Sequence, residues 1–146
     1  MKYYVIDSSV VIKWYIPEIF SEKAVNILYQ IQQGRFKLMA PELILSEIGN
    51  VLWKKTITNE ISFDMAKKII ENIIKTNPVK IVSSKDLISS AFTVAHNTKR
   101  TVYDSMYLAL ALKGRTQLIS ADERLVNSLK GSPFEENICL LQSFNG

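Results

Sequence analysis

Hydrophobic residues recur along this chain with two different periods. Short apolar runs rich in Val, Ile, Leu and aromatic residues favour buried β-strands, and they occur at 2–6, 36–40, 79–82, 117–120 and 137–141. Between these runs, apolar residues spaced three and four apart predict helices over 21–33, 41–55, 62–75, 86–97 and 101–113. A shorter helix is expected after Asp7, ending before Pro17, and another from the fourth strand to residue 130.

Strands and helices therefore alternate from one end of the chain to the other. That alternation predicts an α/β domain with a central, largely parallel sheet of four or five strands flanked by helices. The helices at 41–55 and 62–75 follow one another without a strand between them, so we expect them to form an inserted helical hairpin. With 146 residues, the chain is long enough for one domain, which we place at residues 1–146.

The composition excludes several classes of protein. One Cys excludes an internal disulfide, and one His with one Cys excludes the usual Cys and His zinc sites. The formal charge is +4, and its surplus lies in residues 51–100, which carry nine basic and four acidic side chains. Such a local excess suits a polyanionic partner such as nucleic acid, but solvated helix faces would give the same count.

No targeting or membrane segment is visible in the sequence. The apolar run that follows Lys2 stops at Asp7, and the longest later run, Met106 to Leu112, is far shorter than the roughly 20 residues that span a bilayer. We therefore expect a soluble cytoplasmic protein with no membrane partner.

Two acidic residues directly follow predicted strands. Asp7 comes after the first strand, and Asp122 follows the fourth strand after one Ala. Parallel α/β sheets bind their ligands at the carboxyl ends of the strands, so both acids lie at the edge where function is expected. Both positions could instead be helix caps, with Asp122 acting beside a capping box of Ser120 and Glu123.

Two further acids lie on helices where a carboxylate is unfavourable. Glu47 falls within the apolar stripe of its helix, with no Lys or Arg three or four residues away, although a distant ion pair is an alternative. Asp104 precedes the apolar face of its helix; Arg100 is a candidate partner, and a capping box with Thr101 is an alternative.

Carboxylates that gather in one place repel one another unless a cation neutralises them. An all-oxygen donor set selects Mg²⁺ or Mn²⁺ over zinc or copper. Such ions can activate water and stabilise the leaving oxygen of a phosphodiester, and nearby basic residues would hold the rest of a nucleic acid. Lys13, Lys99 and Arg100 are the candidate RNA contacts. For Lys13, whose neighbour Trp14 could stack on a base, the alternative is an exposed Lys13 beside a Trp14 that packs in the core. For Lys99 and Arg100 the alternative is a solvated turn, and Tyr103 and Tyr107 are expected in the core.

Four strings of the sequence, VIDSSVVIKWYIPE, PELILSEIGNVLWK, TVYDSMYLALAL and LISADERL, resemble the successive motifs of the PIN-domain family, in particular its VapC-like toxins. The resemblance implies a three-layer PIN-like domain and a metal-dependent endoribonuclease, usually a homodimer held inactive by a VapB-type antitoxin. It also implies the site: the four acids that bind Mg²⁺ or Mn²⁺ and two supporting hydroxyls, at Asp7, Glu47, Asp104, Asp122, Ser9 and Ser120.

Other functions remain as alternatives to a toxin. The family includes nucleases of RNA processing, and a non-catalytic α/β module that binds a partner would have the same predicted fold. A phosphatase of the haloacid dehalogenase type also places an Asp after its first strand, but it needs a second Asp where this chain has Ser9. A receiver module would need an Asp after the third strand, where Ser83 and Ser84 stand.

Overall fold

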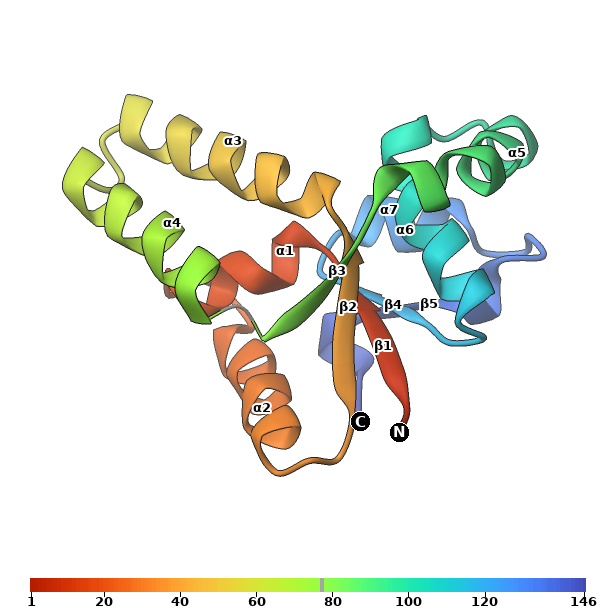
Figure 1. Ribbon diagram of the computed structural model, residues 1–146, viewed down its shortest axis with the longest axis horizontal. Coiled ribbons are helices and arrows are strands. Elements are labelled where there is room, and N and C mark those ends of the chain that lie inside the picture. The colour runs from red at the N-terminus through yellow and green to blue at the C-terminus, as the bar shows by residue number, and fades with distance from the viewer. Residues whose placement is uncertain (77) are drawn as a thin grey trace.

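The five predicted strands form one parallel sheet. The computed structural model describes residues 1–76 and 78–146, and its strands lie in the order β3-β2-β1-β4-β5 (Figure 1). Every neighbouring pair is parallel. The strand bounds are β1 Tyr3–Ile6, β2 Lys37–Pro41, β3 Val79–Val82, β4 Leu118–Ser120 and β5 Ile138–Leu140.

Helices cover both faces of this sheet, which confirms the predicted three-layer α/β arrangement. Helices α1 to α4 lie on one side, and α5 and α6 pack against each other on the opposite side (Figure 1). The helix bounds are α1 Ser8–Val11, α2 Ser21–Gln32, α3 Leu43–Ile57, α4 Phe63–Thr76, α5 Ile88–Thr98, α6 Val102–Lys113 and α7 Glu123–Ser128. A 3₁₀ segment, Ile12–Trp14, continues α1.

Burial explains why the strands read as continuous apolar runs. A parallel sheet between two helical layers must be apolar on both faces. In β1, the side chains of Tyr4, Val5 and Ile6 are all buried, and β4 is buried throughout. Helix α6 is buried from Ser105 to Ala111, because it lies between α5 and the sheet.

The predicted boundaries hold to within a few residues, with one informative difference. Pro41 was expected in the first turn of a helix, but it is the last residue of β2, opposite Val82, and α3 begins only at Leu43. The next residue, Glu42, donates its backbone N–H to the Val82 carbonyl at 2.9 Å, so the pairing of β2 with β3 continues past the proline.

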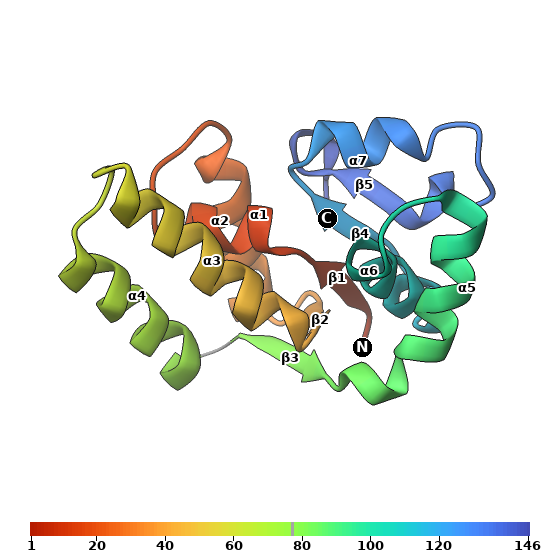
Figure 2. The same ribbon diagram turned by 90° about the horizontal axis from the view of Figure 1, so that it is seen from above.

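Helices α3 and α4 form the predicted hairpin, which extends away from the sheet (Figure 2). Within residues 1–76 and 78–146, no helix is both long and apolar enough to cross a membrane.

Candidate active site

The predicted site residues come from four separate elements. Asp7 follows β1, Glu47 lies on α3, Asp104 lies in the first turn of α6, and Asp122 precedes α7 after the end of β4. Seen from above, the start of α1 lies between α3 and α6, just beyond the carboxyl end of β1 (Figure 2). The sheet edge predicted to carry function is therefore where these elements meet.

Asp7 is a buried carboxylate held by hydroxyl groups. Only 8% of its surface is exposed. Its Oδ1 accepts the Ser9 backbone N–H at 3.1 Å and the Ser9 hydroxyl at 2.5 Å, and the Ser120 hydroxyl interacts with the carboxylate and lowers its pKa. Burial raises the pKa of Asp7 to about 6, the hydroxyl bonds oppose this rise, and the charge of Glu47 adds to it. The structure therefore holds Asp7 where its negative charge is costly.

The two predicted hydroxyls also join the ends of β1 and β4. The Ser9 Oγ accepts the Ala121 backbone N–H at 2.9 Å, and the Ser120 Oγ accepts the Asp122 backbone N–H at 3.1 Å. Each serine thus bonds the Asp7 side chain and the backbone just after β4. This arrangement fixes the first acid relative to the segment that carries the fourth.

Glu47 finds its partner on another helix. The Tyr107 hydroxyl, on α6, donates a hydrogen bond to the Glu47 Oε1 on α3. Partial burial raises the pKa of Glu47, and the nearby charge of Asp104 raises it further. Tyr107 was expected in the core, and it is indeed buried. Its hydrogen bond to Glu47, sixty residues earlier, could not be predicted from any pattern in the sequence.

Asp104 has the partner that the sequence suggested. The Arg100 Nη2 lies 2.9 Å from its Oδ2, Arg100 stands four residues earlier, just before α6, and both side chains are partly exposed. The Asp104 backbone N–H also bonds the Thr101 Oγ1 at 3.1 Å, so Thr101 caps α6. Thr101 therefore supplies its half of the predicted capping box, whereas the Asp104 carboxylate pairs with Arg100 through Oδ2 and keeps Oδ1 for another ligand.

Asp122 acts as a helix cap in this structure. Its Oδ1 accepts the backbone N–H groups of Arg124 and Leu125 at 3.0 and 3.2 Å, and the side chain is exposed. Asp122 itself, not Ser120, is the N-cap of α7. A carboxylate has a second oxygen, so capping by Oδ1 leaves Oδ2 available for another ligand.

Three of the four acids are electrostatically coupled. The charges of Glu47, Asp7 and Asp104 all raise the pKa of Tyr107, after the larger effect of its burial, so its hydroxyl lies among these carboxylates. Within the part of the chain that the structure describes, however, no three Asp, Glu, His or Cys side chains are close enough to form a ready-made metal centre. Asp7, Glu47 and Asp104 therefore lie in one region, and Asp122 adjoins it through the bond of its backbone N–H to Ser120.

The donor chemistry fits a hard divalent cation. All candidate donors are carboxylate and hydroxyl oxygens, which Mg²⁺ and Mn²⁺ prefer. Burial and mutual repulsion raise the pKa values of Asp7 and Glu47, and a bound cation would relieve both effects. The negative charges of this site are therefore unfavourable where no cation balances them.

The three candidate RNA contacts differ in their surroundings. Lys13 is only 8% exposed, and its Nζ lies 3.7 Å from Glu18, which also pairs with Lys55 at 3.4 Å. Lys99 is exposed at the end of α5, in a left-handed conformation with φ of 59°, and Arg100 follows it. We therefore keep Lys99 and Arg100 as RNA candidates and treat Lys13 as part of an ion-pair network.

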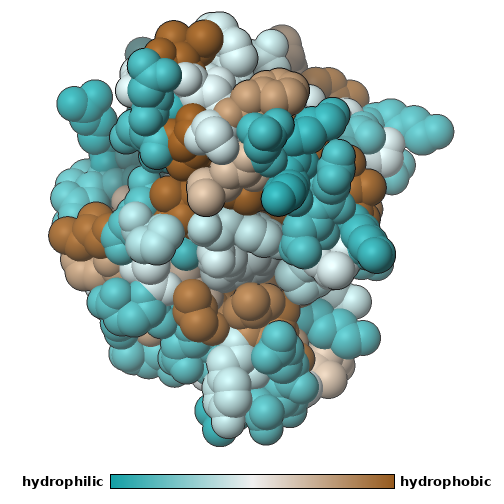
Figure 3. Space-filling model, turned by 90° about the vertical axis from the view of Figure 1, so that its left-hand side faces the viewer, coloured by the Kyte–Doolittle hydropathy of each residue, from teal (hydrophilic) through white to brown (hydrophobic). Residues whose placement is uncertain are grey.

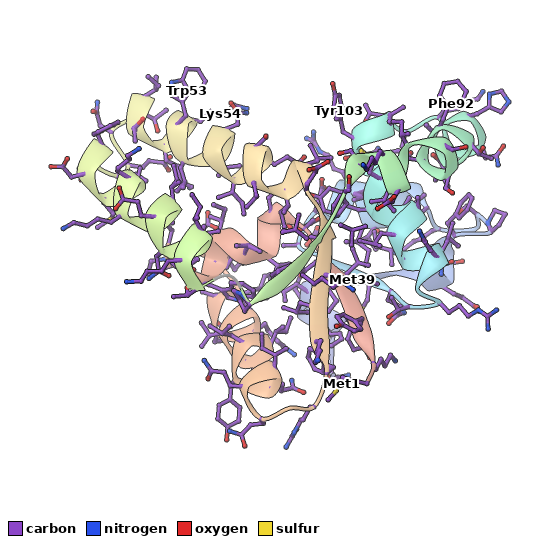
Figure 4. All side chains as sticks on the ribbon, viewed as in Figure 1. Met1, Met39, Trp53, Lys54, Phe92 and Tyr103 are labelled. Carbon is purple, nitrogen blue, oxygen red and sulfur yellow. The ribbon has the colours of Figure 1, made fainter. Side chains whose placement is uncertain are left out.

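The aromatic residues near the site also divide into two groups. The Trp14 Nε1 donates to the Ala24 carbonyl at 2.8 Å, so this side chain joins α2 to the 3₁₀ segment before it. Tyr103 was expected in the core, but it is 65% exposed beside the start of α6. Tyr103 and Phe92 project from the α5–α6 side of the molecule, and Trp53 projects from α3 opposite them (Figure 4).

One described cavity lies away from the acids. It has a volume of about 690 Å³ and is lined by residues of the 3₁₀ segment, α2, α4 and the amino-terminal parts of β1 to β3. The candidate acids follow the carboxyl ends of strands, so this cavity lies at the other end of the sheet.

Comparisons with known proteins agree on one family. A family model described as PIN domain matches residues 4–128. Ribonuclease VapC3 of Pyrobaculum aerophilum is 31% identical over 122 residues, which cover 83% of this chain and 90% of that protein.

Solved structures show the same fold. A crystal structure of a Pyrobaculum aerophilum protein has a TM-score of 0.69 and 20% identity, and covers 97% of this chain and 85% of that one. A toxin–antitoxin complex from Klebsiella pneumoniae has a TM-score of 0.65 and 13% identity, and covers 96% and 98%.

Proposed function

Because this chain belongs to the PIN-domain family, we propose that it is a metal-dependent endoribonuclease and the toxin of a toxin–antitoxin pair. The observation that carries this proposal is Asp7, a buried carboxylate whose pKa is raised to about 6 and which interacts with the charge of Glu47. Keeping such a charge without a cationic partner would cost stability for no structural gain. A cation bound by these acids would balance their negative charges and so explain why they lie together.

Asp7, Glu47, Asp104 and Asp122 are the residues that we propose to hold Mg²⁺ or Mn²⁺. When bound, such an ion supplies an activated water nucleophile and stabilises the charge that develops on the leaving oxygen of a phosphodiester. Ser9 and Ser120 keep the Asp7 carboxylate in place through their hydroxyl bonds. Preorganisation of this kind is what allows a charged site to act without rearranging during the reaction.

Substrate binding falls to two basic residues beside the acids, the exposed Lys99 and the partly exposed Arg100. Lys99 and Arg100 directly precede α6, whose first turn carries Asp104. Their charges can neutralise phosphates on either side of the bond to be cleaved, and binding of this kind depends strongly on salt. Arg100 also offsets the charge of Asp104.

A VapB-type antitoxin is the protein partner that we propose. One solved structure with the same fold is a toxin–antitoxin complex, and this chain has large exposed apolar side chains that a partner could cover. Several of them lie on the α3–α4 hairpin: Trp53, Ile57, Phe63, Met65 and Ile74. The face that includes this hairpin shows apolar patches broken up by hydrophilic side chains (Figure 3).

We also propose that the protein is a homodimer that acts in the cytoplasm, where RNA is available. Light scattering on the purified protein tests the dimer, since a mass equal to that of one chain would contradict it.

Controlled expression in bacteria tests the toxin: growth should stop with the wild type and continue with Asp7→Asn. Normal growth with an active wild-type nuclease would favour a nuclease of RNA processing.

Metal binding separates a nuclease from a non-catalytic partner-binding module. We expect calorimetry to show Mn²⁺ binding to the wild type, and binding at least tenfold weaker to Asp7→Asn, because one charged ligand is lost. Asp86→Asn is the matched control, since Asp86 is exposed in the turn after β3 and should leave the affinity unchanged. Absence of Mn²⁺ binding to the wild type would contradict the proposed function.

A further inference from the structure

Tyr107 joins the two sides of the candidate site. It lies on α6, its side chain is 3% exposed, and its hydroxyl donates to Glu47 on α3. Among the described residues, this is the one hydrogen bond between α3 and α6. Because α3 leads into the hairpin and α6 packs on the sheet, the bond fixes Glu47 relative to the rigid part of the molecule.

The bond has a direction that suits a metal ligand. The Tyr107 hydroxyl donates its hydrogen bond to the Glu47 Oε1, so the lone pairs of the other carboxylate oxygen, Oε2, are left for a cation. A tyrosine hydroxyl, with an ordinary pKa of about 10, carries its proton at neutral pH and therefore acts as the donor in this bond. A donor of this kind restricts the carboxylate rotation that would otherwise move Glu47 away from the other acids.

We propose that Tyr107 is a positioning residue of the metal site, whose hydroxyl orients Glu47 so that its second carboxylate oxygen can bind the cation. The inference rests on the proposed function, because it assumes that Glu47 is a metal ligand. Partners behind a ligand generally contribute a factor of about 10 to 100 in metal affinity, although they never touch the metal. Tyr107 would act in this way through Glu47.

Tyr107→Phe tests the role directly, because it keeps the ring and removes only the hydroxyl. We expect Mn²⁺ affinity, measured by calorimetry, to fall about tenfold. The Mn²⁺ concentration for half-maximal RNA cleavage should rise by the same factor, while the rate at saturating Mn²⁺ recovers to near that of the wild type. A variant that was merely less folded would lose rate at every Mn²⁺ concentration.

Tyr15→Phe is the matched control. The Tyr15 hydroxyl donates to Asn72 at 3.1 Å, away from the acids, so this variant also loses one tyrosine hydrogen bond. We expect its Mn²⁺ affinity to equal that of the wild type. A double variant measures the coupling between Tyr107 and Glu47 in Mn²⁺ binding. If Tyr107 acts through Glu47, then adding Tyr107→Phe to Glu47→Gln should weaken Mn²⁺ binding no further.

The wild-type protein provides a readout that does not depend on how a variant folds. In protein labelled with ¹³C at the tyrosine ζ-carbon, addition of Mg²⁺ should shift the Tyr107 signal and leave the Tyr15 signal in place. An unmoved Tyr107 signal, wild-type Mn²⁺ affinity in Tyr107→Phe, or additive losses in the double variant would each overturn the inference.

These results also separate the inference from the function beneath it. A wild type that binds Mn²⁺ and cleaves RNA, with a Tyr107→Phe variant that does both equally well, overturns only the role of Tyr107. A wild type that binds no Mn²⁺ overturns the proposed function and this inference together.

Discussion

Replacing Asp7 by Asn removes a buried negative charge while keeping the shape of the side chain. The folded protein raises the pKa of Asp7 from 3.8 to about 6, with burial as the largest cause. Ionised Asp7 therefore destabilises the metal-free fold, and its removal should raise the free energy of unfolding. Asp7 is therefore expected to be required for the proposed reaction and, at the same time, to lower the stability of the metal-free fold.

The size of this effect follows from proton linkage. Below pH 3.8, Asp7 is protonated in both the folded and unfolded states and costs nothing. Between pH 3.8 and about 6, the folded state retains the proton longer, so stability falls as pH rises. The shift of about two pKa units corresponds to about 3 kcal/mol above pH 6. An unsatisfied amide hydrogen in the Asn variant offsets about 1 kcal/mol of this.

We therefore expect Asp7→Asn to be more stable than the wild type by about 2 kcal/mol at pH 7.5 in EDTA. At pH 4 most of this advantage should disappear, because Asp7 is largely protonated in the folded wild type. Urea denaturation at both pH values measures the difference, with the exposed Asp86→Asn as control. Equal stability of Asp7→Asn and wild type at pH 7.5 would refute the reasoning.

Three further predictions concern the metal and the RNA. The metal must displace the proton of Asp7, whose pKa is about 6. The Mn²⁺ affinity measured by calorimetry should therefore fall about tenfold from pH 7 to pH 5. An affinity that does not change with pH would count against Asp7 as a ligand. Arg100→Gln breaks a partly exposed ion pair with Asp104, so the free energy of unfolding should change by less than about 1 kcal/mol. The slope of log binding constant against log salt concentration for RNA should become shallower by about 0.7, because one phosphate contact is lost. Lys13→Gln should leave that slope unchanged, because Lys13 is buried against Glu18; a shallower slope would restore it as an RNA contact.

The sequence was sufficient for the features that depend on local pattern. Asp7 and Asp122 could be placed at one sheet edge because each follows an apolar run, and strands of a parallel sheet end at the same side. The pair of Arg100 and Asp104 was visible because the two opposite charges lie only four residues apart in the sequence, around the start of α6. Local periodicity likewise gave the hairpin of α3 and α4.

The remaining features depend on how distant elements pack. Tyr107 meets Glu47 only because α6 and α3 come together across the sheet edge, and no local pattern encodes that meeting. Lys13 is buried beside Glu18, which also pairs with the hairpin residue Lys55, although the sequence suggested that Lys13 would be exposed. Tyr103 was expected in the core, but it lies so close to the start of α6 that nothing covers most of its surface.

Cleavage of RNA by the purified protein tests the central claim most directly. Labelled structured RNA should be cut internally in the presence of Mg²⁺ or Mn²⁺. The same RNA should remain intact with EDTA, and also with Asp7→Asn in either metal. Cleavage that continues in EDTA, or at the wild-type rate in Asp7→Asn, would contradict a metal-dependent nuclease built on these acids.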